Sequence, residues 1–251
     1  MKKIPSKAIL DGDIILYRAA FWGDVEGIDV LEDRLRDDIR KWTPKNVDEV
    51  LVAFSDDRSN NFRRDFWPSY KGKRDGCAPP ECFGPAREIF VEIAGSYKID
   101  RLEADDLMGI GASSGNAIAV TVDKDLKGVP GWHWNPDKDK DIRYVSKKEA
   151  YRFFCMQWLA GDSIDGVPGL WRIGPKKAEK LLDETDPEDW EKVIIEKYIE
   201  EERPEEKKVD MEPIDFAVAM ARCVRILHHR EYDLGNKEFN LLDLDPYLKV
   251  G

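Results

Sequence analysis

Residues 8–20 read AILDGDIILYRAA, an apolar run that ends at two carboxylates before a helical pattern begins. The same order recurs in residues 47–57, VDEVLVAFSDD, and in residues 116–126, NAIAVTVDKDL. Short apolar runs bounded by turn residues are typical of buried strands. Strands that alternate with helices predict an α/β fold with a central, mainly parallel sheet flanked by helices. The carboxyl ends of such strands share one edge of the sheet, so we expect their acids to converge there.

The segments between these strands carry helix signals. Residues 28–42 and 102–115 have an amphipathic pattern, and residues 85–97 begin with proline, which the first turn of a helix tolerates. Residues 60–84 instead combine aromatic, basic, proline and glycine residues without periodicity. They predict an exposed excursion from the sheet.

The second half of the chain is mainly helical by pattern. Residues 146–160 open with a capping box, Ser146 and Glu149, and predict a helix. Residues 161–182 predict a turn, a hairpin and a helix, and residues 128–145 a hairpin or loop in which the tryptophans pack. We therefore expect two regions, an α/β core at 1–145 and a mainly helical region at 146–251.

Composition limits the class of protein. Of the 251 residues, 42% are apolar, which is enough for a substantial core. The net charge of −11 argues against a protein that coats nucleic acid nonspecifically, although basic residues gather at 58–74 and 172–180. No run resembles a membrane span or a signal peptide, so we expect a cytoplasmic protein. The four cysteines lack paired spacing and are expected to be free thiols.

Acidic residues gather at the ends of five predicted elements. They are Asp11 and Asp13; Asp56 and Asp57; Glu103, Asp105 and Asp106; Asp123 and Asp125; and Asp162 and Asp165. No histidine accompanies them, and oxygen ligands alone suit Mg²⁺ or Mn²⁺ better than zinc. One such pair is more often a helix cap or a turn, but five together favour a site for two divalent ions. Paired ions of this kind hydrolyse phosphodiesters.

Five blocks then carry a family resemblance. They are LDGDIILYRAA (10–20), FSDDRSNNFRRDFWPSYKGKRD (54–75), EADDLMG (103–109), TVDKDL (121–126) and GDSIDGVPGLWRIGPKKAEKLL (161–182). In this order they resemble the 5′ to 3′ exonuclease and flap endonuclease family, especially its stand-alone bacteriophage members. The resemblance implies a PIN-like 5′ nuclease core, a helical arch at about 58–85 and a helix-three-turn-helix DNA-binding region. It also implies DNA cleavage near 5′ ends in replication and RNA primer removal, in a bacterial host cell if the protein is phage-encoded.

The resemblance also implies metal ligands. Around the first ion it places Asp11, Asp56, Glu103 and Asp105, and around the second, directly or through water, Asp105, Asp106, Asp123, Asp125, Asp162 and Asp165. Asp56 is preferred to Asp57 because it lies six residues before Phe62, as the family's spacing requires. Asp13 is an extra acid that the family does not require.

Basic and aromatic residues of the excursion receive roles in the same way. Lys71 resembles the lysine at the base of the arch that contacts the scissile phosphate, where a cation offsets developing negative charge. Arg74 is expected to assist it and Arg63 to bind a neighbouring phosphate, with solvated surface charge as the ordinary alternative. Tyr70 is expected to stack on a base, and for Phe66 and Trp67 packing is an equal alternative.

The 161–182 block resembles the family's duplex-binding hairpin, which often holds a K⁺ ion. Lys176, Lys177 and Lys180 are expected to contact DNA without sequence preference. Two departures bear on the hairpin and its K⁺ site: Arg172 stands where glycine is usual, and Gly166 where asparagine is frequent. The stretch between Lys73 and Pro85 is short for an arch, which favours exonucleolytic cutting over flap cutting.

Two other readings stay open. A PIN-like ribonuclease shares the acidic α/β site but lacks the 161–182 hairpin, and a structure-specific DNA-binding module would have lost catalysis. The glycines at 109–115 do not have dinucleotide-binding spacing. The expected partners are DNA with a 5′ end, flap or nick, RNA–DNA hybrids, and replication proteins in trans.

Overall fold

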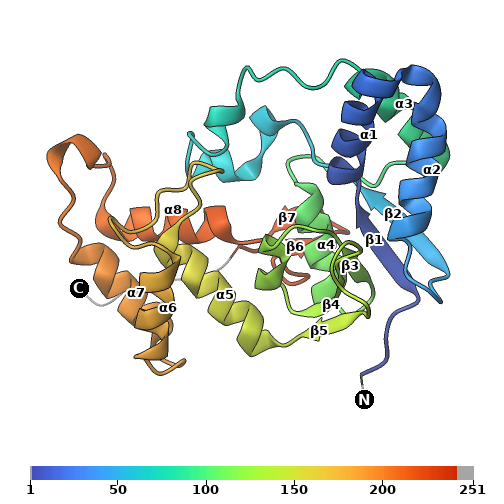
Figure 1. Ribbon diagram of the computed structural model, residues 1–251. Helices are drawn as coiled ribbons and strands as arrows, with labels where there is room; N and C mark the ends of the chain where they lie inside the picture. The colour runs from blue at the N-terminus through green and yellow to red at the C-terminus, as the bar shows by residue number, and fades with distance from the viewer. Residues whose placement is uncertain (1, 242–251) are drawn as a thin grey trace.

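A computed structural model describes residues 2–241 and contains a five-stranded sheet with helices on both faces (Figure 1). The strands are β1 (Lys7–Asp11), β2 (Glu49–Ala53), β3 (Ile118–Val120), β4 (Gly131–Trp134), β5 (Arg143–Val145), β6 (Tyr232–Asp233) and β7 (Glu238–Phe239). The α-helices are α1 (Gly12–Glu26), α2 (Leu31–Trp42), α3 (Phe83–Ala94), α4 (Ala104–Ser113), α5 (Lys147–Ala160), α6 (Pro175–Asp183), α7 (Trp190–Ile199) and α8 (Pro213–Val224). Short 3₁₀ turns are η1 (Ile28–Val30), η2 (Arg58–Asn60), η3 (Phe62–Asp65), η4 (Gly72–Arg74), η5 (Asp125–Gly128) and η6 (Glu205–Lys207).

The strand order creates a switch point beside β1. The order is β2-β1-β3-β4-β5, with β1 to β4 parallel and β5 antiparallel to β4. The chain leaves β1 for β2 on one side and reaches β3 on the other, so the connections diverge above β1 and β3. Open parallel sheets bind ligands at such a point, beyond the carboxyl ends of the strands. The predicted α/β fold with a mainly parallel sheet is confirmed.

Apolar side chains on the two faces of the sheet form separate cores. Leu10 and Val120 face α1, α2 and α3, whereas Ile9 and Ala119 face α4. This alternation follows from the period of two along a strand. Both sides of β1 are therefore buried, which explains why its sequence is apolar without interruption.

The second half packs into a third core around α5, α6, α7 and α8, which Trp158 and Tyr198 help to fill. The capping box predicted for Ser146 and Glu149 is present at the start of α5. After α8 the chain returns to the first half, where Ile226, Leu227 and Tyr232 pack in the core of α4. The division of the chain at residue 145 stays a prediction.

Three local expectations are corrected. Helix α1 begins at Gly12, with no turn at 11–13, because Asp11 itself caps it by accepting the amide of Ile14. The predicted helical arch is absent from residues 58–82 of the described chain, which contain only η2, η3 and η4. The β6–β7 hairpin lies in a stretch that the sequence suggested to be helical. Its two-residue strands are too short to give a periodic signal.

None of the helices within residues 2–241 is long and apolar enough to cross a membrane. The four cysteines lie within the same range and are all free, as expected.

His133 on β4 provides a prediction for the pH dependence of stability. Burial lowers its pKa to about 4, although a bond to the carbonyl of Val129 partly opposes the shift. The unfolded chain takes up this proton below about pH 6.5 and the folded chain does not, so folding loses stability as the pH falls. We expect wild type to lose about 1–2 kcal/mol more than His133→Gln between pH 7 and pH 5. Urea unfolding at both pH values measures this difference, and equal losses would contradict it.

Candidate active site

The end of β1 supplies the first buried acid of the site. Asp11 accepts hydrogen bonds from the amide of Ile14 at 3.1 Å and from the hydroxyl of Thr121, beyond β3, at 2.6 Å. Burial, together with repulsion from Asp13 and Asp123, raises the pKa of Asp11 to about 7. The switch point thus holds a carboxylate whose negative charge lacks a matching cation.

The start of α4 supplies further acids. Glu103 precedes the helix as its N-cap, and Asp105 and Asp106 lie in the first turn. Acids are favoured there because the first amides of a helix have no partners within the helix. Burial raises the pKa of Asp105, and the charges of Asp11 and Asp123 raise it further. Helix α4 therefore brings its acids to those of β1 and β3.

Lys71 forms the cationic centre of the site. Its ammonium forms a salt bridge with Glu103 and lies 3.6 Å from Asp165. Burial opposes its charge, but Glu103 and Asp165 raise the pKa of Lys71 above its usual value. Although burial alone would raise the pKa of Glu103, Lys71 and Arg63 lower it to about 2. Both side chains are therefore held in the ionised state.

The 161–167 turn contributes from the helical half. Asp162 accepts the amides of Ile164 and Asp165 at 2.8 and 3.2 Å, and a backbone bridge joins Asp162 to Val167. Asp165 accepts a bond from Arg74 at 2.9 Å, and its carbonyl accepts the amide of Lys71 at 2.7 Å. The base of the 58–85 segment is thereby fastened to this turn.

Asp125 links the two halves from the sheet side. It follows β3 and accepts the side-chain amide of Gln157, on α5, at 2.9 Å. Burial, with repulsion from Asp123 and Asp162, raises the pKa of Asp125 to about 6. Thr121, which opens the TVDKDL block, and Gln157 also hold carboxylates of the site, but nothing in the sequence around Gln157 marks it.

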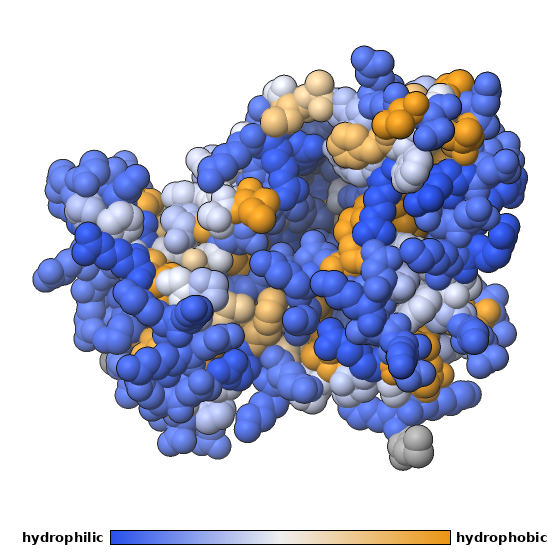
Figure 2. All heavy atoms as spheres, viewed as in Figure 1, coloured by the Kyte–Doolittle hydropathy of each residue, from blue (hydrophilic) through white to orange (hydrophobic). Residues whose placement is uncertain are grey.

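The acids line a hollowed, hydrophilic part of the surface. The face in Figure 2 is recessed near its upper centre, below the 54–82 segment that Figure 1 draws in cyan. A cavity of about 30 Å³ lies between the two halves and is lined by Lys71, Glu103, Asp105, Asp125 and Asp165, among others. Within residues 2–241, no three acidic, thiol or imidazole groups converge closely enough to hold a metal ion as they lie. The oxygen atoms of these acids and their unbalanced negative charge suit a divalent cation. The acids are not, however, already arranged as a set of metal ligands.

Two predicted site residues have a different place in the structure. Arg63 is buried, and its guanidinium forms two bonds to Asp106 at 2.7 and 2.8 Å. It also donates to the carbonyls of Cys223 and Arg225. Asp106, fully buried, accepts the amides of Glu103 and Leu227 as well. Arg63 was expected to contact a phosphate and Asp106 a metal ion. Both expectations are corrected, because protein groups use the hydrogen-bonding atoms of both side chains.

Tyr70 is also corrected. Its side chain is buried in the core of the helical half, where no base can stack on it. The hydroxyl instead donates to Glu103 at 2.8 Å and lies 3.5 Å from Asp165. Tyr70 thus orients two acids that come from different halves of the chain.

Asp56 follows β2 and is paired with protein groups. It accepts the amide of Arg101 at 2.8 Å and the side chain of Asn60 at 2.7 Å, and it forms a salt bridge with Lys98. Burial opposes these bonds, yet together they lower the pKa of Asp56. Protein groups already pair with its oxygens, and its metal contact stays a prediction. Asp13, the extra acid, accepts a hydrogen bond from the amide of Ser55. The charges of Glu103 and Lys71 act on its pKa in opposite directions.

The hairpin lysines Lys176, Lys177 and Lys180 are exposed on α6. Their charges therefore face solvent near the first backbone amides of this helix. Arg172, before this helix, has a φ of 59°, in the left-handed region that favours glycine. The departure from glycine therefore costs backbone strain. Gly166 has a φ of 72°, and a Cβ there would come within 3.0 Å of the carbonyl oxygen of Ser69.

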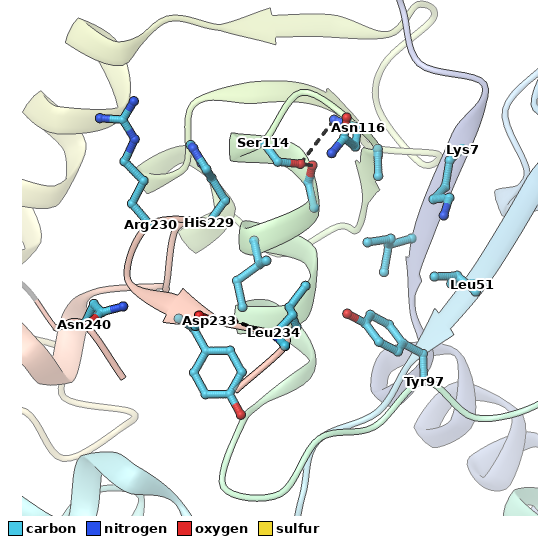
Figure 3. A pocket seen from close by; sticks show the side chains of 16 residues that line it. Lys7, Leu51, Tyr97, Ser114, Asn116, His229, Arg230, Asp233, Leu234 and Asn240 are labelled. Atoms are coloured by element: carbon cyan, nitrogen blue, oxygen red, sulfur yellow. Dashed lines mark hydrogen bonds between the residues drawn. The ribbon is translucent and has the colours of Figure 1, made fainter. Parts of the chain in front are cut away.

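A larger cavity lies away from these residues. It has a volume of about 630 Å³ and lies between β1, the end of α4 and the β6–β7 hairpin, with Lys7, Tyr97 and Arg230 on its walls (Figure 3). None of the predicted site residues lines it. Size alone therefore does not identify the active site in this fold.

Comparison with known proteins gives relatives that are nucleases and polymerases by name. The chain is 28% identical to DNA polymerase I of Rhizobium leguminosarum over 78% of its own length and 20% of the relative's. It is 27% identical to flap endonuclease Xni of Shewanella amazonensis, covering 69% of this chain and 75% of that protein. The Xni of Shewanella denitrificans is 32% identical, with 53% and 58% covered. The chain thus spans about a fifth of the first of these relatives.

Solved structures of the bacteriophage T5 5′-exonuclease share the fold. The zinc-bound form has a TM-score of 0.54 at 16% identity, with 87% of this chain and 86% of that chain covered. The complex of the T5 flap endonuclease with DNA and metal ions has a TM-score of 0.53. No protein-family model matches the chain. Sequence relatives that are flap endonucleases by name, and the shared fold, agree with the resemblance of the five blocks to the 5′ to 3′ exonuclease and flap endonuclease family.

Proposed function

We propose that the protein is a metal-dependent 5′ nuclease that hydrolyses DNA phosphodiester bonds at or near 5′ ends. One observation carries the proposal: acids from β1, β3, α4 and the 161–167 turn gather beside a buried lysine at the switch point of the sheet. Several of these acids have pKa values raised by burial and mutual repulsion, as expected of ligands whose charge a cation balances. Sequence relatives that are flap endonucleases by name support the same activity.

Oxygen-only ligands favour Mg²⁺ or Mn²⁺, and two groups of acids suggest two ions. Asp11, Asp56, Glu103 and Asp105 form the first group, with Asp13 as an additional acid beside Asp11 and Glu103. Asp123, Asp125, Asp162 and Asp165 form the second. Bound cations would activate water and offset charge on the phosphate. Lys71 and Arg74 would hold the phosphate beside the acids, because ammonium and guanidinium groups balance its added charge.

DNA with a 5′ end is the proposed substrate, and RNA–DNA hybrids fit a role in primer removal during replication. Residues 75–82 contain no helix that could clamp a long flap. We therefore expect faster cutting at a duplex 5′ end than at a flap. Rates on matched flapped and blunt duplexes measure this preference, and a strong preference for flaps would contradict it.

The main experiment uses duplex and flapped DNA labelled at the 5′ or the 3′ end, with Mg²⁺ or EDTA. Cleavage from 5′ ends that requires Mg²⁺ and is abolished in Asp123→Asn is the expected result. Glu238→Gln, at an exposed acid far along the chain, is the matched control and should cut normally. Cleavage of single-stranded RNA alone would favour a PIN-like ribonuclease. Binding of branched DNA without cleavage would favour a non-catalytic module.

The exposed hairpin lysines give a separate prediction. We expect Lys176→Ala/Lys177→Ala to weaken duplex binding and to reduce the slope of log affinity against log salt by about 2, since each phosphate contact contributes about 0.9. Fluorescence anisotropy at several K⁺ concentrations with Ca²⁺ as the divalent ion measures this slope. The same titration with Na⁺ in place of K⁺ tests the proposed K⁺ site. Lys192→Ala/Lys197→Ala, on α7, is the matched control, and an equal change there would contradict the assignment to the hairpin.

A further inference from the structure

Exposed apolar side chains concentrate at one end of α1. Among residues 2–241, eleven large apolar side chains are more than a third exposed, and five of them lie between residues 21 and 30. These five, called the α1 patch below, are Phe21, Trp22, Val25, Ile28 and Val30. Val25 is 77% exposed and Phe21 is 60% exposed. Apolar atoms gather over this end of α1 and η1, at the upper right of Figure 2.

The patch is the second apolar face of a helix that already has one. Ile15, Leu16 and Ala19 of α1 are buried in the core against the sheet. Helices on a protein surface usually have one apolar face and one polar face, and a helix that is apolar on both sides is normally covered on both. Exposed apolar patches that contain aromatic residues are typical of protein-binding sites.

Negative charge surrounds the patch. Residues 21–37 contain six acidic and two basic residues, a net charge of −4. Both arginines are paired, Arg34 with Asp38 and Arg36 with Glu32. The exposed carboxylates of Glu26, Asp29 and Asp33 have no ion pair within the described chain. A ligand of this surface must therefore tolerate or balance anionic charge.

The patch is separated from the acids of the active site by the length of α1. The helix begins at Gly12, directly after Asp11, and ends at Glu26. At 1.5 Å per residue, its two ends are about 20 Å apart. A partner on the patch would leave the carboxylates and Lys71 accessible to DNA.

We propose that the α1 patch binds a basic, amphipathic helical segment of another protein. Apolar side chains of such a segment would cover Phe21, Trp22 and Val25, and its lysines or arginines would face the unpaired acids. DNA is disfavoured because its phosphates would meet the same acids. A second copy of this chain is disfavoured because two identical patches would place acids against acids. The proposal is independent of the nuclease activity.

The probe is an 18-residue synthetic helix with leucines on one face and lysines on the other. A second peptide with glutamate in place of every lysine is its control. Isothermal titration calorimetry is expected to show binding of the lysine peptide at least tenfold tighter than that of the glutamate peptide. Equal affinities would overturn the proposal, as would binding of single-stranded DNA, without peptide present, that Phe21→Ser/Val25→Ser abolishes. Sedimentation that shows a dimer broken by Phe21→Ser would assign the patch to a second copy instead.

Variants separate the patch from the general negative charge of the chain. We expect two double variants, Phe21→Ser/Val25→Ser and Asp29→Asn/Asp33→Asn, each to lower the affinity for the lysine peptide at least fivefold. Their melting temperatures and DNA cleavage should be unchanged. Glu202→Gln/Glu206→Gln removes two exposed acids elsewhere and should leave the affinity unchanged. If this control weakens binding as much as the patch variants do, attraction to the whole chain explains the result and the proposal fails.

Discussion

Lys71→Met is expected to slow DNA cleavage in a single turnover by about 10²–10³-fold, the usual loss when one charge-stabilising group is removed. The Lys71 ammonium touches Glu103 and lies 3.6 Å from Asp165, so it faces acids from both halves of the chain. A phosphate held at those acids would lie next to this cation. Quench-flow measurement at saturating Mg²⁺ gives the rate, and anisotropy gives the affinity for DNA. We expect the affinity to change much less than the rate.

Lys73→Met is the matched control because it removes the same charge two residues away. Lys73 is exposed and donates to the carbonyl of Ser163 at 2.9 Å, without contact to an acid of the site. Its rate should stay within about threefold of wild type, since an exposed and solvated charge contributes little. Equal slowing in both variants would mean that the general charge of the 58–85 segment matters and that Lys71 has no special role.

Sequence periodicity was sufficient to predict three of the five strands of the sheet, β1, β2 and β3, but not that residues 128–145 extend it with β4 and β5. The apolar runs before Asp11, Ser55 and Thr121 are short, end in polar residues and alternate with helical patterns, and each contains a strand in the structure. The carboxyl ends of parallel strands lie at one edge of the sheet, so the proximity of Asp11 and Asp123 follows from the order of the elements. The family resemblance adds Lys71 as a phosphate contact, and in the structure Lys71 lies between Glu103 and Asp165.

The misassigned residues depend on contacts that are distant in sequence. Arg63 lies in a basic, loop-like segment typical of DNA contacts, but its partners include carbonyls at Cys223 and Arg225, about 160 residues away. Tyr70 is buried by helices that follow residue 146. Local composition describes the residue types near a position and says nothing about which distant segment will cover it. The arch assignment was also wrong. It came from the family resemblance, and residues 58–82 have no helical pattern of their own.

Arg63→Met is expected to lower the free energy of unfolding by about 3–5 kcal/mol, the usual cost of leaving one partner of a buried ion pair alone. Asp106 is fully buried and loses two guanidinium bonds in this variant. The carbonyls of Cys223 and Arg225 lose their donor at the same time. Urea unfolding in metal-free buffer measures the change. Arg64→Met is the control, since within residues 2–241 the only ion pair of Arg64 is with the exposed Asp75, and its loss should be below about 1 kcal/mol.

A second substitution tests whether the uncompensated charge of Asp106 causes the loss. Arg63→Met/Asp106→Asn removes that charge and keeps an oxygen for one of the two amides, those of Glu103 and Leu227, which bond to different oxygens of Asp106. We expect it to be about 2 kcal/mol more stable than Arg63→Met alone, because a neutral amide is far easier to bury than a carboxylate. If the double variant is no more stable, the lost packing and the two unpaired carbonyls account for the effect. Arg63 would then connect residues 223–225 to α4 mainly through those carbonyls and its packing.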